Sequence, residues 1–143
     1  MAFLLDVNVL MALMDPSHVH HGTAHSWFET DGRDAWATCP LTQNAVLRIF
    51  GHSRYPNSPG PPSQVVPMLR RLCDLPGHRF WTDDISLLDP HHLDAARLLH
   101  AAQLTDSYLL ALARAHGGRL ATFDRRLVTT AVPNGPACLT LIG

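Results

Sequence analysis

The sequence predicts an α/β protein, in which helices cover both faces of a mostly parallel sheet. Short apolar runs of strand type alternate along the chain with longer stretches whose apolar residues recur at helical spacing. This alternation is typical of parallel sheets whose strands are joined by helices. Neither a repeat nor a linker interrupts it, so we expect a single domain over residues 1–143.

The expected elements follow from the apolar pattern and from cap and turn residues. Strands are predicted over residues 2–6, 35–40, 78–81, 119–124 and 137–142. Helices are predicted over residues 7–14, 20–30, 42–50, 63–75, 89–99, 105–116 and 125–130. Thr42 and Ser63 are the expected N-caps of the third and fourth helices, and Asp89-Pro90 is the expected start of the fifth. The Pro-, Gly- and Ser-rich segment 51–62 is expected to be a loop.

The composition excludes several classes of protein. Hydrophobic residues make up 46% and charged residues 16%, as in a globular domain rather than a disordered chain. The net charge of −1 neither favours nor excludes a nucleic-acid partner, and three scattered cysteines form no disulfide framework. The chain lacks the run of roughly 18 apolar residues that a membrane span needs. Its N-terminus is a poor signal peptide, so we expect a cytoplasmic protein without a membrane partner.

Three aspartates occupy similar positions at the ends of predicted elements. Asp6 ends the first strand, Asp124 ends the strand after a double glycine, and Asp106 lies in the first turn of the helix before that strand. Because strand carboxyl ends and some helix N-termini meet at one edge of a parallel sheet, these acids can converge. Taken singly, Asp106 could be an acid favoured by the helix dipole, and Asp124 could be a helix cap. Asp6 has no such simple explanation, because its neighbours are apolar.

Converging carboxylates repel one another unless they take up protons or share a cation. A hard divalent ion such as Mg²⁺ suits an all-oxygen site of this kind. Such an ion would polarise a phosphoryl oxygen and activate a water for attack on a phosphodiester. The acids therefore indicate metal-assisted hydrolysis.

Three segments around these acids resemble the motifs of PIN-domain ribonucleases, and more narrowly those of VapC toxins from bacterial type II toxin–antitoxin systems. They are Leu5–Leu10 (LDVNVL), Thr105–Ala113 (TDSYLLALA) and Leu120–Arg125 (LATFDR). The resemblance covers essentially the whole chain. It implies a three-layer α/β/α sandwich and an endoribonuclease that depends on Mg²⁺ or Mn²⁺. It also implies an RNA substrate, a homodimer and inhibition by a cognate VapB antitoxin.

The resemblance also assigns roles to individual residues. Asp6, Asp106 and Asp124 fall on three of the family's acidic positions, as catalytic and metal-binding residues. The fourth position, usually a Glu at the start of the helix after the second strand, is occupied by Gln43. This amide can still coordinate through its oxygen, but it removes one negative charge and should weaken metal binding.

Three further polar residues are candidates for the site. Asn8 and Thr122, near strand ends, are expected to be accessory polar groups or local caps. Arg54 is the arginine best placed to contact RNA phosphates, because it lies in a loop that can reach a substrate.

These observations predict a Mg²⁺-dependent endoribonuclease toxin. The alternative from another class is a non-catalytic PIN domain that binds RNA or its antitoxin, and Gln43 is the feature that favours it. A different phosphate-handling α/β enzyme is disfavoured, because the chain has no Gly-rich phosphate loop.

Overall fold

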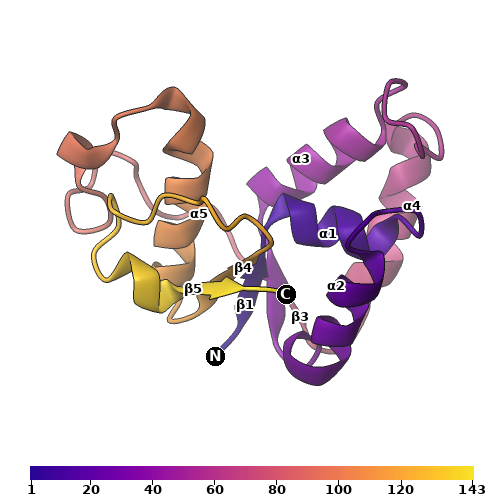
Figure 1. The fold of residues 1–143 in the computed structure, drawn as a ribbon, viewed down its shortest axis with the longest axis horizontal. Helices are drawn as coiled ribbons and strands as arrows, with labels where there is room; N and C mark the ends of the chain where they lie inside the picture. Colours follow the sequence, from indigo (N-terminus) through magenta and orange to yellow (C-terminus); the bar gives the residue numbers. More distant parts are fainter.

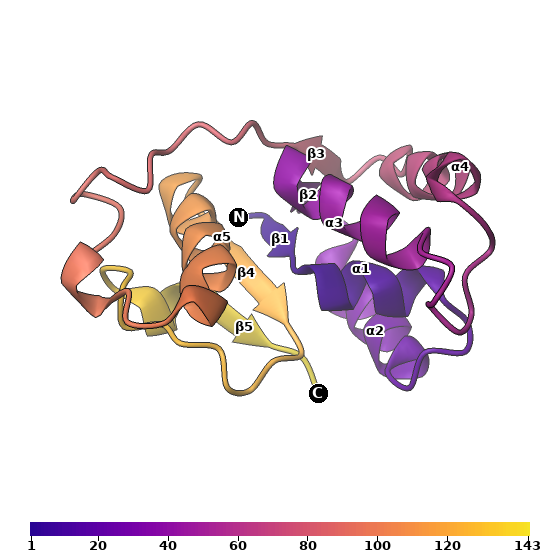
Figure 2. The same ribbon diagram turned by 90° about the horizontal axis from the view of Figure 1, so that it is seen from above.

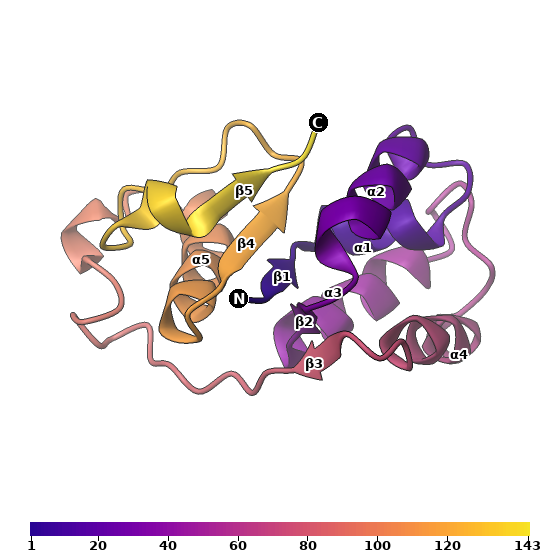
Figure 3. The ribbon, with the colours of Figure 1, turned by 90° about the horizontal axis from the view of Figure 1, so that it is seen from below.

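One sheet of five parallel strands forms the centre of the protein, as seen in a computed structural model that describes residues 1–143. The strands are β1 (Phe3–Leu5), β2 (Trp36–Thr38), β3 (His78–Phe80), β4 (Arg119–Thr122) and β5 (Leu139–Leu141). Their order is β3-β2-β1-β4-β5, and all four pairings are parallel. The chain thus builds the sheet from β1 toward β3 and then returns to the other side of β1 (Figure 3). The predicted α/β class is confirmed.

Five α-helices cover the sheet. They are α1 (Val7–Met14), α2 (His21–Trp27), α3 (Pro40–Phe50), α4 (Pro62–Cys73) and α5 (Leu104–Ala115). A π-helical turn at Phe28–Gly32 extends α2. Figures 1 and 2 show α5 on one side of the sheet and the four N-terminal helices on the other, which confirms the three-layer sandwich. A helix with the length and hydropathy to cross a bilayer does not occur.

Alternation along the strands supplies a separate core to each face. Leu4 of β1 and Leu120 of β4 are register partners, and both belong to the core under α5. The next pair, Leu5 and Ala121, belongs to the core under the N-terminal helices. Because both faces are apolar, each one must be covered by helices.

Two predicted helices are absent. Residues 89–99 form turns with only a 3₁₀ segment at Ala95–Arg97, and residues 125–130 contain no helix. In both places an aspartate starts a turn instead. Asp89 accepts the backbone N–H of His91, and Asp124 accepts the backbone N–H of Arg126. Such local bonds from side chain to backbone compete with the hydrogen bonds of a helix.

The two predicted N-caps are also wrong. α3 begins at Pro40 with Cys39 as its N-cap, and Thr42 lies in the first turn, where its hydroxyl accepts the backbone N–H of Cys39. α4 begins at Pro62, one residue before Ser63. Proline explains both shifts, because its fixed φ and missing N–H suit the first position of a helix.

A buried aspartate ties the loop after α3 to the end of α1. Asp15 is 1% exposed, and its carboxylate accepts hydrogen bonds from the Tyr55 hydroxyl, the Asn57 amide and the Ser17 backbone N–H. Burial by itself raises the pKa of an acid. Here the three hydrogen bonds outweigh burial and hold the pKa of Asp15 below its usual value. The ionised form therefore joins the loop to the helix.

Replacing Tyr55 by Phe keeps the ring but removes the hydroxyl from Asp15. We expect the free energy of unfolding at pH 7 to fall by about 1–3 kcal/mol, the value of a hydrogen bond to a charged group. Because folding lowers the pKa of Asp15, its contribution is complete above the unfolded pKa and is lost as pH falls through the folded pKa. In urea titrations, the difference between wild type and variant should therefore shrink toward about pH 3.

Tyr108→Phe is the matched control, because it removes a hydroxyl that bonds to the exposed carboxylate of Asp83. If the two variants show the same pH dependence, Asp15 does not hold the loop in this way.

Candidate active site

The three predicted aspartates lie at the carboxyl-terminal edge of the sheet. Asp6 directly follows β1, Asp124 lies two residues beyond β4, and Asp106 is in the first turn of α5. β1 and β4 are adjacent at the point where the order of the strands reverses, which is where open α/β sheets bind their ligands. Asp106 and Asp124 line one cavity of about 300 Å³, together with Gln103 and Arg126.

Thr122 connects the carboxyl ends of β1 and β4. Its hydroxyl donates to Asp6 Oδ2 at 2.7 Å, and accepts the Asn8 amide at 3.0 Å and the Asp124 backbone N–H at 3.1 Å. The Asn8 side-chain oxygen accepts the backbone N–H of Phe123 at 3.3 Å. Since Thr122 is fully buried, these bonds satisfy its hydroxyl. They fix both the orientation of Asp6 and the path of the chain toward Asp124.

Asp6 is 7% exposed and serves as the N-cap of α1, where its Oδ1 accepts the Val7 backbone N–H at 2.7 Å. Burial is the largest influence on the pKa of Asp6 and raises it. Hydrogen bonds from Thr122 and Val7 lower this pKa, and the negative charge of Asp124 raises it further. The net pKa lies above the ordinary value, so the charged form of Asp6 is held at a cost in free energy.

The negative charges of the other two aspartates affect the pKa of Asp106. Its pKa is raised to about 6, first by burial and then by the negative charges of Asp6 and Asp124. None of the three carboxylates forms an ion pair with an arginine or histidine. Arg126 lines the same cavity, but its hydrogen bond to Asp124 comes from the backbone N–H. The site therefore concentrates negative charge that no side chain neutralises.

The donor set suits a hard divalent cation, because every candidate ligand atom is a carboxylate oxygen. No group of three or more His, Cys, Asp or Glu side chains is arranged to hold an ion by itself. Mg²⁺ is usually held by one or two carboxylates and keeps several water ligands, so an open set of acids fits this ion. A closed structural zinc site, which needs Cys or His ligands, does not fit.

Gln43 and Arg54 lie outside the contacts of this cluster. The Gln43 amide donates to Thr38 Oγ1 at 3.0 Å, and its side chain lines a cavity of about 250 Å³ beside α4. Arg54 is exposed in the loop after α3 and lines a different hollow. Gln43 and Arg54 thus line two different cavities. The structure brings together the other five predicted site residues, which are Asp6, Asn8, Asp106, Thr122 and Asp124.

Gln103 and Arg126 are two of the residues lining the acidic cavity that the sequence did not predict. Gln103 is 6% exposed, and its amide oxygen accepts the backbone N–H groups of Leu99 and His100 ahead of α5. Arg126 follows Asp124 by two residues. Proximity in sequence to a predicted acid was the only signal available for either residue.

The fold and this acidic edge are those expected of a PIN domain, and comparison with known proteins gives the same family. A family model described as the PIN domain matches residues 3–133. Ribonuclease VapC44 of Mycobacterium tuberculosis is 44% identical over 133 residues, which are 93% of each chain. Ribonuclease VapC39 of the same organism is 39% identical over 131 residues, covering 92% of this chain and 94% of the relative. The chain therefore belongs to the PIN-domain family, and within it to the VapC proteins.

A solved structure shares the fold at much lower sequence identity. The crystal structure of Mycobacterium tuberculosis VapC20, described as a sarcin–ricin loop cleaving toxin, superposes with a TM-score of 0.65 and 14% identity. The match covers 92% of this chain and 97% of that chain. Sequences so different share the fold because it depends on apolar pattern rather than on particular core residues.

Replacing Asp106 by Asn should stabilise the metal-free protein, because it removes a charge that is disfavoured first by burial and then by the neighbouring acids. Folding raises the pKa of Asp106 from 3.8 to about 6, so ionising this residue costs folding free energy. The cost is absent below the unfolded pKa and complete above the folded one. Allowing for solvent screening, we expect a gain of about 1 kcal/mol at pH 8 and none at about pH 3 in urea unfolding with a chelator.

The exposed residue Asp34, which makes no side-chain hydrogen bond, provides the control Asp34→Asn. An equal gain in both variants would mean that general charge reduction, and not the acid cluster, causes the effect.

Proposed function

We propose that this protein is a metal-dependent endoribonuclease toxin in which Asp6, Asp106 and Asp124 bind the metal and carry the catalysis. The observation that supports this most is the convergence of three carboxylates, from three separate elements, without a cationic side chain to pair with them. The names of the relatives, which are ribonucleases, support RNA as the substrate.

When bound, Mg²⁺ or Mn²⁺ would polarise a phosphoryl oxygen and lower the pKa of a nearby water. The protein contributes position and charge. Thr122 orients the carboxylate of Asp6, and the bond from Phe123 N–H to Asn8 fixes the backbone that leads to Asp124. The first turn of α5 brings Asp106 to the same cavity. Asn8 and Thr122 therefore act as positioning residues.

Membership of the VapC group also supports proposals about the molecules that this protein binds. We propose that a VapB-type antitoxin neutralises it, that it forms a homodimer, and that Arg54 contacts the RNA. Binding of the antitoxin would have to block either the acidic cavity or the path of RNA to it.

Asp6→Asn tests the proposed catalysis. The amide oxygen can still accept the Val7 N–H, but the negative charge is lost. We expect cleavage of single-stranded RNA in Mg²⁺ to fall by roughly 100-fold or more, as when a main electrostatic group of an active site is removed. Gel analysis of purified wild type, Asp6→Asn and the exposed control Asp34→Asn measures this, with thermal unfolding to verify folding. Full activity of Asp6→Asn, or cleavage by the wild type that persists in a chelator, contradicts the proposal.

The alternative function, a PIN domain that binds RNA or antitoxin without cleaving, has Gln43 in its favour. If the missing carboxylate had disabled the site, restoring it should create activity. In the structure, however, the Gln43 amide bonds to Thr38 and lines the cavity beside α4. This placement supports an enzyme that works with three acids.

Gln43→Glu should therefore leave the cleavage rate within about tenfold of wild type, which corresponds to about 1.4 kcal/mol of activation free energy. Single-turnover RNA cleavage in Mg²⁺ measures the rate. Gln64→Glu, at an exposed position of α4, makes the same chemical change away from Gln43. An inactive wild type together with an active Gln43→Glu variant would establish the binding-only alternative.

A further inference from the structure

The charges of this protein are unevenly distributed along the chain. Residues 35–73 contain four arginines and no Asp or Glu. All 12 acidic residues and the other seven arginines lie elsewhere, so the net charge of −1 divides into +4 within this stretch and −5 outside it. The stretch comprises β2, α3, the following loop and α4. A basic unit is therefore joined to the strongly acidic edge of the sheet.

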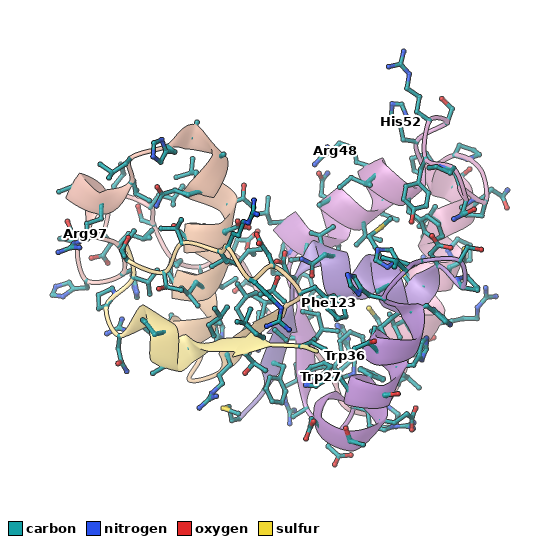
Figure 4. All side chains as sticks on the ribbon, in the orientation of Figure 1. Trp27, Trp36, Arg48, His52, Arg97 and Phe123 are labelled. Atoms are coloured by element: carbon teal, nitrogen blue, oxygen red, sulfur yellow. The ribbon has the colours of Figure 1, made fainter.

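A hollow of about 290 Å³ lies at the outer end of this unit, which we call the α3 hollow. It is lined by five residues from the end of α3 and the loop after it: Arg48, Ile49, His52, Arg54 and Tyr55. Figure 4 shows Arg48 and His52 at the same edge of the molecule. The guanidinium groups of Arg48 and Arg54 form neither ion pairs nor hydrogen bonds within the protein. Both cations are therefore available to an external anion.

The two rings of the α3 hollow are held in place by the protein. The backbone N–H of Arg54 donates to His52 Nδ1 at 3.0 Å, so Nε2 of this imidazole is the nitrogen left to donate outward. The Tyr55 hydroxyl bonds to Asp15, and its ring packs edge-on against Phe50 with centroids 5.3 Å apart. The hollow thus combines two free guanidinium groups with two oriented rings.

We propose that the α3 hollow binds the backbone and a base of single-stranded RNA that extends from the acidic cavity. Cations interleaved with aromatic rings are typical of sites for single-stranded nucleic acid, because phosphates pair with the cations and bases stack on the rings. This inference rests on the proposed function for the identity of its ligand. It adds Arg48, His52 and Tyr55 to Arg54 as one binding site.

α3 connects this hollow to the acids. The helix begins directly after β2, at the carboxyl-terminal edge of the sheet where the aspartates lie, and it ends at the hollow. At 1.5 Å per residue, Arg48 is about 12 Å along the helix from Pro40. One RNA strand can therefore contact both places. An acidic peptide would pair with the arginines, but its carboxylates would not stack on the rings, and the acid cluster would repel it.

The salt dependence of RNA binding tests the cations. Binding of a short fluorescent single-stranded RNA is measured by anisotropy in a chelator, so that no cleavage occurs. The variant Arg48→Ala/Arg54→Ala should reduce the slope of log affinity against log salt by about 1.4, the value for two lost phosphate contacts on a single strand. Its affinity at roughly 0.1 M NaCl should fall by about tenfold or more.

The matched control is Arg70→Ala/Arg71→Ala. It removes the same charge from the same acid-free stretch, at exposed positions of α4 outside the hollow. We expect its slope to stay close to that of the wild type. An equal fall in both double variants would show that net charge alone is responsible, and this would overturn the inference.

A second variant tests the rings. His52→Ala should lower RNA affinity by about fivefold or more through lost stacking, with a smaller effect on the salt slope than the double arginine variant. A short oligoglutamate peptide serves as the competing ligand. If the double arginine variant loses binding of this peptide but binds RNA like the wild type, the hollow is a site for acidic peptides and the inference fails.

The outcome for this site is separable from that of the proposed function. A protein that binds RNA through these residues but never cuts it in Mg²⁺ would overturn the catalytic proposal and leave the α3 hollow supported. A protein that cuts RNA, and whose binding slope is unaffected by the double arginine variant, would overturn only the hollow.

Discussion

The register between β1 and β4 determines where the acids meet. Leu5 pairs with Ala121, so the next residues of the two strands, Asp6 and Thr122, lie side by side. The Thr122 hydroxyl then bonds to the Asp6 carboxylate inside the protein. A slip of one residue would move every side chain of one strand to the opposite face. It would also separate this pair, so the packing of the two cores and the geometry of the site depend on the same alignment.

Buried carboxylates have opposite effects on folding stability at the acidic edge and beside the loop after α3. Asp15 is buried with three hydrogen bonds and a lowered pKa, so its ionisation stabilises the fold. The pKa of Asp6 is raised because burial outweighs the hydrogen bonds from Thr122 and Val7, and the pKa of Asp106 is raised by burial and by the charges of Asp6 and Asp124. Side chains that destabilise their own fold tend to be retained for function. The contrast within one chain therefore distinguishes Asp15, whose charge stabilises the fold, from the two acids that we propose bind the metal.

The sequence was informative where local pattern and strand topology determine structure. α1 was predicted over residues 7–14, as found, because apolar helix formers end at Asp15-Pro16. The convergence of Asp6, Asp106 and Asp124 followed from the general geometry of parallel sheets and not from any detailed contact. In the same way, the alternation of elements was enough to predict the layers.

The rest required tertiary information. α3 starts at Pro40 instead of Thr42, so Gln43 is the fourth residue of the helix and not the first after a cap. The Gln43 amide bonds to Thr38 of β2, a contact that no sequence pattern specifies. The absence of a helix at residues 89–99 likewise reflects competition between local turns and helix, which apolar spacing does not reveal. The first error reflects the preference of Pro40 for the first helical position, and the second reflects the bond from the Asp89 side chain to the backbone of His91.

The strand order also affects how the protein is made. Asp6 and its partner Thr122 are 116 positions apart, and Asp106 and Asp124 likewise belong to the last part of the chain. Synthesis from the N-terminus lets early segments fold first. β1 and β2 can therefore form before the codons for β4 have been translated. A growing chain therefore contains one acid of the cluster but not the other two. For the nuclease proposed here, the site cannot form until the residues up to Asp124 have been synthesised.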